Sequence, residues 1–197
     1  MSALFDRISA RLTQGHARTD VPLHRDPRAL ISEDFKPAAV LVALTEREEP
    51  GVLLLHRPST MRAHPGQVAL PGGRIDADET PIDAALREAH EELGIAPALV
   101  RVIGQTDRYA TGSGYDITPV IGVIPPDLAI SPNPTEVAQW FEAPLAFVLD
   151  PANHHLKTSE WEGRKVDYFE IQWREHRIWG VTAGVLRNLS LRLGCHG

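Results

Sequence analysis

Three glutamates lie close together in one short stretch of the chain. Glu88, Glu91 and Glu92 belong to the run Arg-Glu-Ala-His-Glu-Glu-Leu-Gly-Ile, residues 87–95. If this run is helical, like charges three or four residues apart repel one another, and carboxylates near the C-terminal end also oppose the helix dipole. Oxygen-rich clusters suit hard divalent cations such as Mg²⁺ or Mn²⁺. We therefore expect a metal site here, the alternative being an acidic surface exposed to solvent.

A helix over residues 81–93 would position these carboxylates. Thr80 is suited to the N-cap, Pro81 to the first helical position and Asp83 to the capping box, while Gly94 is suited to end the helix. At about 100° per residue, one face carries an apolar stripe of Ile82, Ala85, Leu86, Ala89 and Leu93. The glutamates fall in an adjoining sector, so we expect them to point together beside the packed face.

The wider spacing resembles the Nudix box. That pattern reads Gly, five residues, Glu, seven residues, then Arg-Glu-aliphatic-x-Glu-Glu-x-Gly-aliphatic. Gly73, Glu79 and Arg87 occupy its fixed positions together with the three glutamates, and Ala89 is smaller than the usual aliphatic residue. The resemblance implies a loop-helix-loop that binds a divalent metal and hydrolyses a diphosphate linked to another group.

The same resemblance implies a role for each residue of the box. Glu88, Glu91 and Glu92 would hold the metal, with the backbone carbonyl of Gly72 as a further ligand. Glu79 and Arg87 would support them by joining the preceding loop to the helix. The group that takes the proton from water is left open among Glu88, Glu91 and later residues, namely Glu136, His154, His155 and Glu160.

A second motif lies upstream of the box. It resembles the extra motif of Nudix coenzyme A diphosphatases, which reads Leu-Leu-Thr-x-Arg-Ser, three residues, Arg, three residues, Gly-x-Val-x-Phe-Pro-Gly-Gly. Arg57, Arg62, Gly66 and the Pro-Gly-Gly of residues 71–73 are in register. Guanidinium groups pair well with phosphates, so the arginines would bind substrate, and Gly66 and Gly73 would permit turns or a close backbone approach. The departures from the motif are Leu55, Pro58 and Leu70.

Two downstream segments are similar to the same subfamily. Residues 109–120 resemble its Thr-x-Ser-Gly-aromatic…Thr-Pro-Val segment, and residues 178–183 resemble its Ile-Trp-Gly-x-Thr-Ala ending. The resemblance implies that Tyr109, Ser113 and Tyr115 line a substrate loop. The alternative is that the aromatic rings simply pack around a glycine-rich turn.

Together these resemblances imply hydrolysis of coenzyme A or acyl-coenzyme A at its diphosphate. The products would be 4′-phosphopantetheine, or its acyl form, and adenosine 3′,5′-bisphosphate, with Mg²⁺ or Mn²⁺ as cofactor. A first alternative is a hydrolase of ADP-ribose or another nucleoside diphosphate derivative, because the three departures weaken the subfamily motif. A second is a noncatalytic Nudix module that binds a nucleotide, whose marks would be a lost glutamate or an attached DNA-binding domain.

Composition limits the class of protein. The 197 residues are 43% hydrophobic with a net charge of −6. This argues against a nucleic-acid-binding surface, while local arginines can still bind a phosphorylated small-molecule substrate. The longest apolar run, residues 38–44, is too short to cross a membrane, and the single Cys195 excludes an intrachain disulfide. We expect a cytoplasmic enzyme with no nucleic-acid or membrane partner, and a homodimer is left open.

The chain should fold as one α/β domain. We expect residues 1–36 to supply an amphipathic helix over residues 3–14 and an irregular lead-in, both packed on a single Nudix hydrolase domain of residues 37–197. A closing helix is expected over residues 181–193. Expected strands cover residues 38–44, 52–57, 99–106, 116–124, 136–143, 165–173 and 176–179, the last two as a hairpin. The resemblance implies the Nudix fold, a mixed β-sheet between helical layers (α/β/α).

Overall fold

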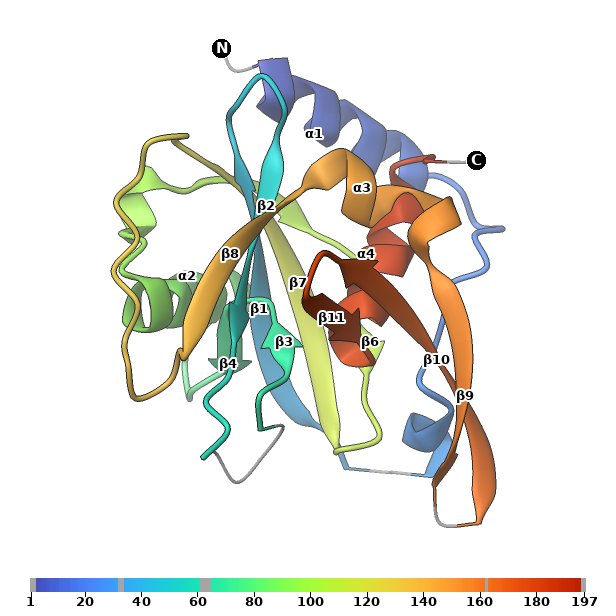
Figure 1. Ribbon diagram of the computed structural model, residues 1–197. Coiled ribbons are helices and arrows are strands. Elements are labelled where there is room, and N and C mark those ends of the chain that lie inside the picture. The colour runs from blue at the N-terminus through green and yellow to red at the C-terminus, as the bar shows by residue number, and fades with distance from the viewer. Residues whose placement is uncertain (1–2, 32–33, 61–64, 162, 196–197) are drawn as a thin grey trace.

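A computed structural model describes residues 3–31, 34–60, 65–161 and 163–195. It contains an eight-stranded mixed sheet, a separate three-stranded sheet and helices on both sides of the larger sheet (Figure 1). Arg62, a predicted substrate-binding residue, lies outside the described residues. Within those residues no helix combines the length and apolar character needed to cross a membrane.

The larger sheet is built around two long parallel strands. β1 (Lys36–Thr45) and β7 (Tyr115–Ile124) pair in parallel along their whole length, from Lys36 opposite Tyr115 to Thr45 opposite Ile124. The other six strands of this sheet are β2 (Gly51–His56), β3 (Val68–Ala69), β4 (Gly72–Arg74), β5 (Arg101–Gln105), β6 (Tyr109–Ala110) and β8 (Gln139–Pro144). The smaller sheet contains β9 (His155–Trp161), β10 (Arg164–Trp173) and β11 (His176–Trp179).

β1 and β2 pair at one end and diverge at the other. They pair where Leu44 lies opposite Val52, whereas at the far end β4 pairs with β1 and places Gly72 opposite Val40. On its other side β2 pairs with β8. Gly72 and Gly73, at the start of the predicted box, therefore lie beside β1 in the middle of the sheet.

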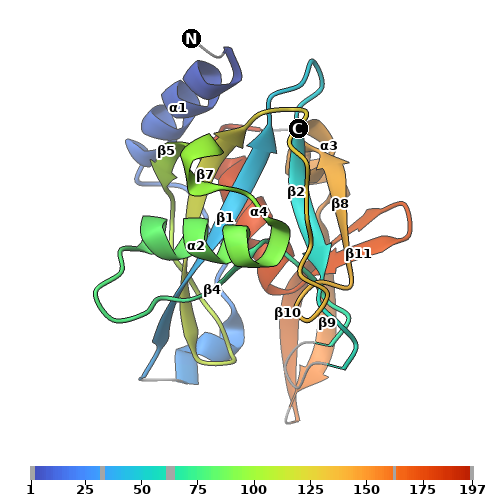
Figure 2. The ribbon, with the colours of Figure 1, turned by 90° about the vertical axis from the view of Figure 1, so that its left-hand side faces the viewer.

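Helices cover both faces of this sheet. α2 (Pro81–Leu93) lies against one face, and α4 (Val181–Arg192) lies on the other (Figure 2). α1 (Ala3–His16) and α3 (Leu145–Leu149) pack against α4. Short 3₁₀ turns occur at Pro27–Ile31, Pro97–Leu99 and Pro151–Asn153.

The alternation of side chains along the strands explains the two cores. In β1, Leu41 faces the core under α2, whereas Val42 faces the core under α4. β2 repeats this pattern with Leu53 on the α2 side and Leu54 on the α4 side. Successive side chains of a strand point to opposite faces, so near-continuous apolar runs are what a sheet buried on both faces requires. The mixed sheet between helices confirms the predicted fold class.

The helix that carries the glutamates begins and ends where predicted. The Thr80 hydroxyl accepts the Asp83 N–H, and the Asp83 carboxylate accepts the Thr80 N–H at 3.1 Å, which completes the capping box. Gly94 ends the helix with φ 71°, a left-handed conformation that glycine adopts without strain. Glu92 is only 3% exposed, a burial that the sequence pattern did not indicate.

Several elements differ from the sequence prediction. The strand expected at residues 136–143 begins only at Gln139. The predicted hairpin is present as β10 and β11, but a third strand, β9, was missed because its side chains are nearly all exposed and show no apolar alternation. The other elements that were not predicted are α3, the short strands β3, β4 and β6, and the three 3₁₀ turns.

Candidate active site

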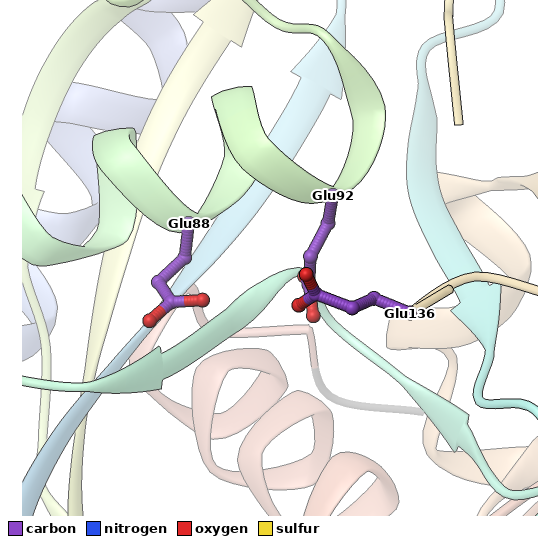
Figure 3. Close-up of side chains that lie close together, drawn as sticks. All are labelled: Glu88, Glu92 and Glu136. Carbon is purple, nitrogen blue, oxygen red and sulfur yellow. The ribbon is translucent and has the colours of Figure 1, made fainter. Parts of the chain in front are cut away.

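Three carboxylates converge beneath α2. Glu88, Glu92 and Glu136 each offer an oxygen, and these oxygens lie within 4.8 Å of one another. Glu88 and Glu92 project from the same side of the helix, and Glu136 reaches toward Glu92 from a different segment of the chain (Figure 3). We call these three residues the carboxylate cluster. The sequence suggested Glu136 only as a candidate base. The structure places its carboxylate next to those of Glu88 and Glu92.

Main-chain hydrogen bonds bring Glu136 to the helix. The N–H groups of Ser131 and Asn133 donate to the carbonyls of Leu93 and Glu92, each at 2.9 Å. These carbonyls belong to the last turn of α2 and have no partner within the helix. The Asn133 side chain then donates to Glu136 Oε1 at 3.1 Å. The loop thus caps the helix end and directs Glu136 into the cluster.

Glu92 is the most deeply buried member of the cluster. Its Oε2 accepts the backbone N–H of Gly72 at 2.9 Å. Loss of solvent raises the pKa of Glu92 to about 8, with the charge of Glu88 acting in the same direction, while the Gly72 hydrogen bond and the charge of Arg57 oppose the shift. Burial also raises the pKa of Glu88, against the lowering effect of its hydrogen bond from Arg87. The cluster therefore lacks enough positive charge to balance three carboxylates.

A different arrangement surrounds Arg87. Its Nε and Nη2 donate to the two oxygens of Glu79 at 2.7 and 3.0 Å, and Nη2 also donates to the Arg74 carbonyl at 3.0 Å. Nη1 donates to Glu88 at 2.9 Å and to Glu91 at 3.1 Å. The hydrogen bonds from Arg87 lower the pKa of Glu79 to about 2. The ion pair expected between Glu79 and Arg87 is present, and it joins the loop to the helix.

Glu91 lies outside the carboxylate cluster. Its side chain is 50% exposed and pairs with Arg87 one turn earlier on the helix. The structure thus separates Glu91 from Glu88 and Glu92, which the sequence placed in one sector. A residue adjacent in sequence to Glu92 points about 100° away around the helix, enough to leave it on the solvent side.

The paired glycines lie directly against the cluster. A Cβ atom on Gly73 would overlap the carboxylate of Glu88, and one on Gly72 would overlap the backbone of β1 at Ala39. Glycine at both positions therefore permits the close approach of β4 to the helix and to β1. Gly66 lies farther up the chain, in a turn with φ 68°, where glycine avoids strain.

Arg57 follows β2 and lacks a complete set of partners. Its backbone N–H donates to the Gln67 carbonyl at 3.0 Å, but its side-chain Nε is buried without a hydrogen-bond partner among the described residues. Its charge acts on Glu92 and favours the ionised carboxylate. A buried donor without an acceptor is costly, which is typical of a group that meets a ligand.

The downstream aromatic segment is divided between core and surface. Tyr109 is 4% exposed and its ring packs against Gly184 of α4, so it belongs to the core, as the packing alternative proposed. Ser113 is exposed, and its hydroxyl lies 3.0 Å from that of Thr111 within the β6–β7 turn. Tyr115 is partly exposed at the start of β7. Among the described residues, no hydrogen bond or ion pair joins these three residues to the carboxylate cluster.

The other candidate bases lie elsewhere. His154 is buried, with its Nε2 2.8 Å from the Val148 carbonyl. His155 and Glu160 are exposed on β9, in the smaller sheet. Of the four later candidates, the structure brings only Glu136 to the cluster.

Sequence comparison assigns the family. A family model described as the NUDIX domain matches residues 35–175, most of the chain and the whole of the region that builds the cluster. This chain belongs to the Nudix family.

Relatives of known family agree with this assignment. The chain is 45% identical over 161 residues to an uncharacterized Nudix hydrolase, NudL, of Enterobacter sp. (strain 638), covering 81% of this chain and 83% of the relative. It is 41% identical over 162 residues to the NudL of Escherichia coli (strain K12), covering 82% and 84%. A solved Nudix hydrolase of M. smegmatis, RenU, superposes with a TM-score of 0.50 at 29% identity over 58% of this chain and 73% of that one.

The Nudix hydrolase assignment makes this chain an enzyme that acts on diphosphate-containing substrates, and Nudix hydrolases generally use divalent metal ions. The residues present fit such an ion. Three carboxylates with mutually close oxygens form the hard oxygen donor set that Mg²⁺ and similar ions prefer. Burial raises the pKa of Glu92, and a bound cation would favour its ionised form.

Proposed function

We propose that this Nudix hydrolase cleaves the diphosphate of coenzyme A or acyl-coenzyme A, using Mg²⁺ or Mn²⁺ held by Glu88 and Glu92 beside Glu136. The observation that carries the proposal is the position of Arg57. This residue belongs to the motif resembling coenzyme A diphosphatases, and its charge acts on Glu92 while its Nε has no hydrogen-bond partner among the described residues. A phosphate oxygen would satisfy that Nε, and Arg62 and Gly66 of the same motif would complete the phosphate-binding segment.

The cation would neutralise charge on the diphosphate and make a water molecule easier to deprotonate. The protein residues have separate tasks. Arg57 donates to a phosphate oxygen and so holds the diphosphate against the cluster. Gly72 keeps Glu92 in place through its N–H, and its carbonyl is proposed as a further metal ligand.

We propose Glu136 as the group that takes the proton from water. Asn133 holds its Oε1, which orients the carboxylate toward Glu92 and leaves Oε2 available. The water oxygen bonds to a phosphorus atom as the bridging phosphorus–oxygen bond breaks, and the proton passes to Glu136. The leaving phosphate departs with the bridging oxygen.

In this proposal Glu79 and Arg87 touch neither the substrate nor the cation, and they act by positioning other residues. Arg87 binds Glu88 directly and fixes the helix to the loop that ends in Glu79. Glu91 would reach a cation only by giving up its contact with Arg87, so we propose a weaker, auxiliary role for it. Ser113 and Tyr115 remain proposed substrate contacts on the exposed turn, and the core position of Tyr109 limits it to supporting that turn.

One substrate panel tests the proposal. Purified protein with Mg²⁺ or Mn²⁺ should cleave coenzyme A with a higher kcat/KM than ADP-ribose, NADH or a nucleoside triphosphate. The products, identified by mass, should be 4′-phosphopantetheine and adenosine 3′,5′-bisphosphate. A higher kcat/KM for ADP-ribose would overturn the coenzyme A assignment while leaving the Nudix chemistry intact.

A further inference from the structure

A hollow lies on the opposite side of the molecule from the carboxylate cluster. It has a volume of about 370 Å³ and is bounded by residues 24–28 and the smaller sheet, β9–β11. Figure 1 shows this sheet on the α4 side of the larger sheet, whereas α2 lies on the other side. Small-molecule sites usually enclose roughly 300–1,000 Å³, so the hollow is large enough to hold a compact ligand.

One wall of the hollow is held rigidly. Asp26 is 4% exposed and accepts the Arg28 side chain at 2.9 Å from Nε and 2.7 Å from Nη2. It also accepts the Gly112 N–H at 2.9 Å, which ties this wall to the β6–β7 turn. A wall fixed by several hydrogen bonds loses little entropy when a ligand binds.

The opposite wall is aromatic. Trp161, Tyr168 and Trp179 line it, and the last two rings meet edge to face with centroids 5.7 Å apart. The Arg177 guanidinium lies 4.9 Å from the centre of the Trp179 ring and is fixed by a 2.6 Å hydrogen bond to Glu170. Aromatic and guanidinium planes are the surfaces on which planar heterocycles stack.

The charges of the hollow argue against an anionic ligand. Arg28 is neutralised by Asp26, and Arg177 is neutralised by Glu170. Asp167, which also borders the hollow, accepts the Thr158 hydroxyl at 2.6 Å. Neither arginine of the hollow is therefore free to pair with an anion.

We propose that this hollow binds an uncharged planar heterocycle, such as the base of a nucleoside, at a site separate from the carboxylate cluster. The ring would stack against the aromatic wall. None of the residues that line the hollow belongs to the carboxylate cluster or to the motif that carries Arg57 and Gly66.

Calorimetric titration of metal-free protein with adenosine tests the proposal, since adenosine has the planar ring but no phosphate. We expect saturable binding of one adenosine per chain. Trp179→Ala should weaken it at least about fivefold, as expected for loss of one base–aromatic stack. Trp161→Ala should have a similar effect, and it decides the matter if circular dichroism shows that Trp179→Ala does not fold.

Two variants serve as controls. Trp140→Ala removes a ring that is 37% exposed on β8, outside the hollow, and Glu92→Gln alters the other side of the sheet; both should bind adenosine as the parent does. AMP should bind no more tightly than adenosine. The proposal fails if adenosine does not bind, if both tryptophan variants of the hollow bind it normally, if Glu92→Gln abolishes binding, or if AMP or inorganic phosphate binds more tightly than adenosine.

Discussion

Two groups of acidic side chains around α2 have opposite surroundings. Glu79 and Glu91 lie around Arg87, which supplies hydrogen bonds to both and lowers the pKa of Glu79 to about 2. Glu92 and Glu136 lie in the carboxylate cluster, where burial raises the pKa of Glu92 to about 8. Glu88 belongs to both groups. The first group finds its partners within the protein, whereas we propose that a cation completes the second, and this difference separates the proposed supporting residues from the proposed metal ligands.

The largest difference in kcat should appear between variants of two adjacent residues, Glu91 and Glu92. Glu92→Gln should lower kcat by about a thousandfold or more, because it removes a buried ligand that acts in the transition state. Glu91→Gln is the matched control and should lower kcat by less than about tenfold, since its partner is Arg87. Steady-state kinetics on both variants, with far-UV circular dichroism to check the fold, makes the measurement. Equal losses in the two variants would remove the distinction between the groups.

Glu136→Gln should have the next largest effect, with kcat lowered by about a hundredfold or more, because a general base typically contributes at least about that much. The change keeps the shape of the side chain, so the contact with Asn133 can persist. Glu160→Gln, on the other sheet, should leave kcat unchanged. A normal rate for Glu136→Gln would mean that another group takes the proton.

Disruption of the Arg87 group should have an intermediate effect. Glu79→Gln should lower kcat about ten- to a hundredfold, the usual range for residues that orient metal ligands. The affinity for Mn²⁺ should fall in parallel because Arg87 no longer fixes Glu88. If activity falls while Mn²⁺ affinity does not, the pair acts by a route other than positioning the cluster.

The smallest expected effect is on stability. Because the folded-state pKa of Glu92 is raised above its ordinary value of 4.5 to about 8, the folded metal-free protein binds more protons than the unfolded chain between these values. Its free energy of unfolding should therefore fall as the pH rises from about 5 to 8. Urea unfolding at both ends of this range should show the decrease in the parent and a much smaller one in Glu92→Gln. A parent stability independent of pH would contradict the burial of an ionisable Glu92.

Local rules account for what the sequence predicted. Thr80, Asp83 and Gly94 fix the ends of α2 through contacts within a few residues, so both ends were predictable. Long apolar runs likewise revealed β1 and β7. The arrangement of the cluster depends on contacts between distant segments. Glu136 joins it only because Asn133 caps the carbonyl of Glu92, and no periodicity in the sequence encodes that contact.

Binding of Mn²⁺ to the protein, followed by electron paramagnetic resonance at pH 8, tests the central claim most directly. The account predicts saturable binding in the parent and in Glu91→Gln, and loss of binding in Glu92→Gln. Mn²⁺ that binds as tightly to Glu92→Gln as to the parent would show that the buried carboxylates do not hold the cation.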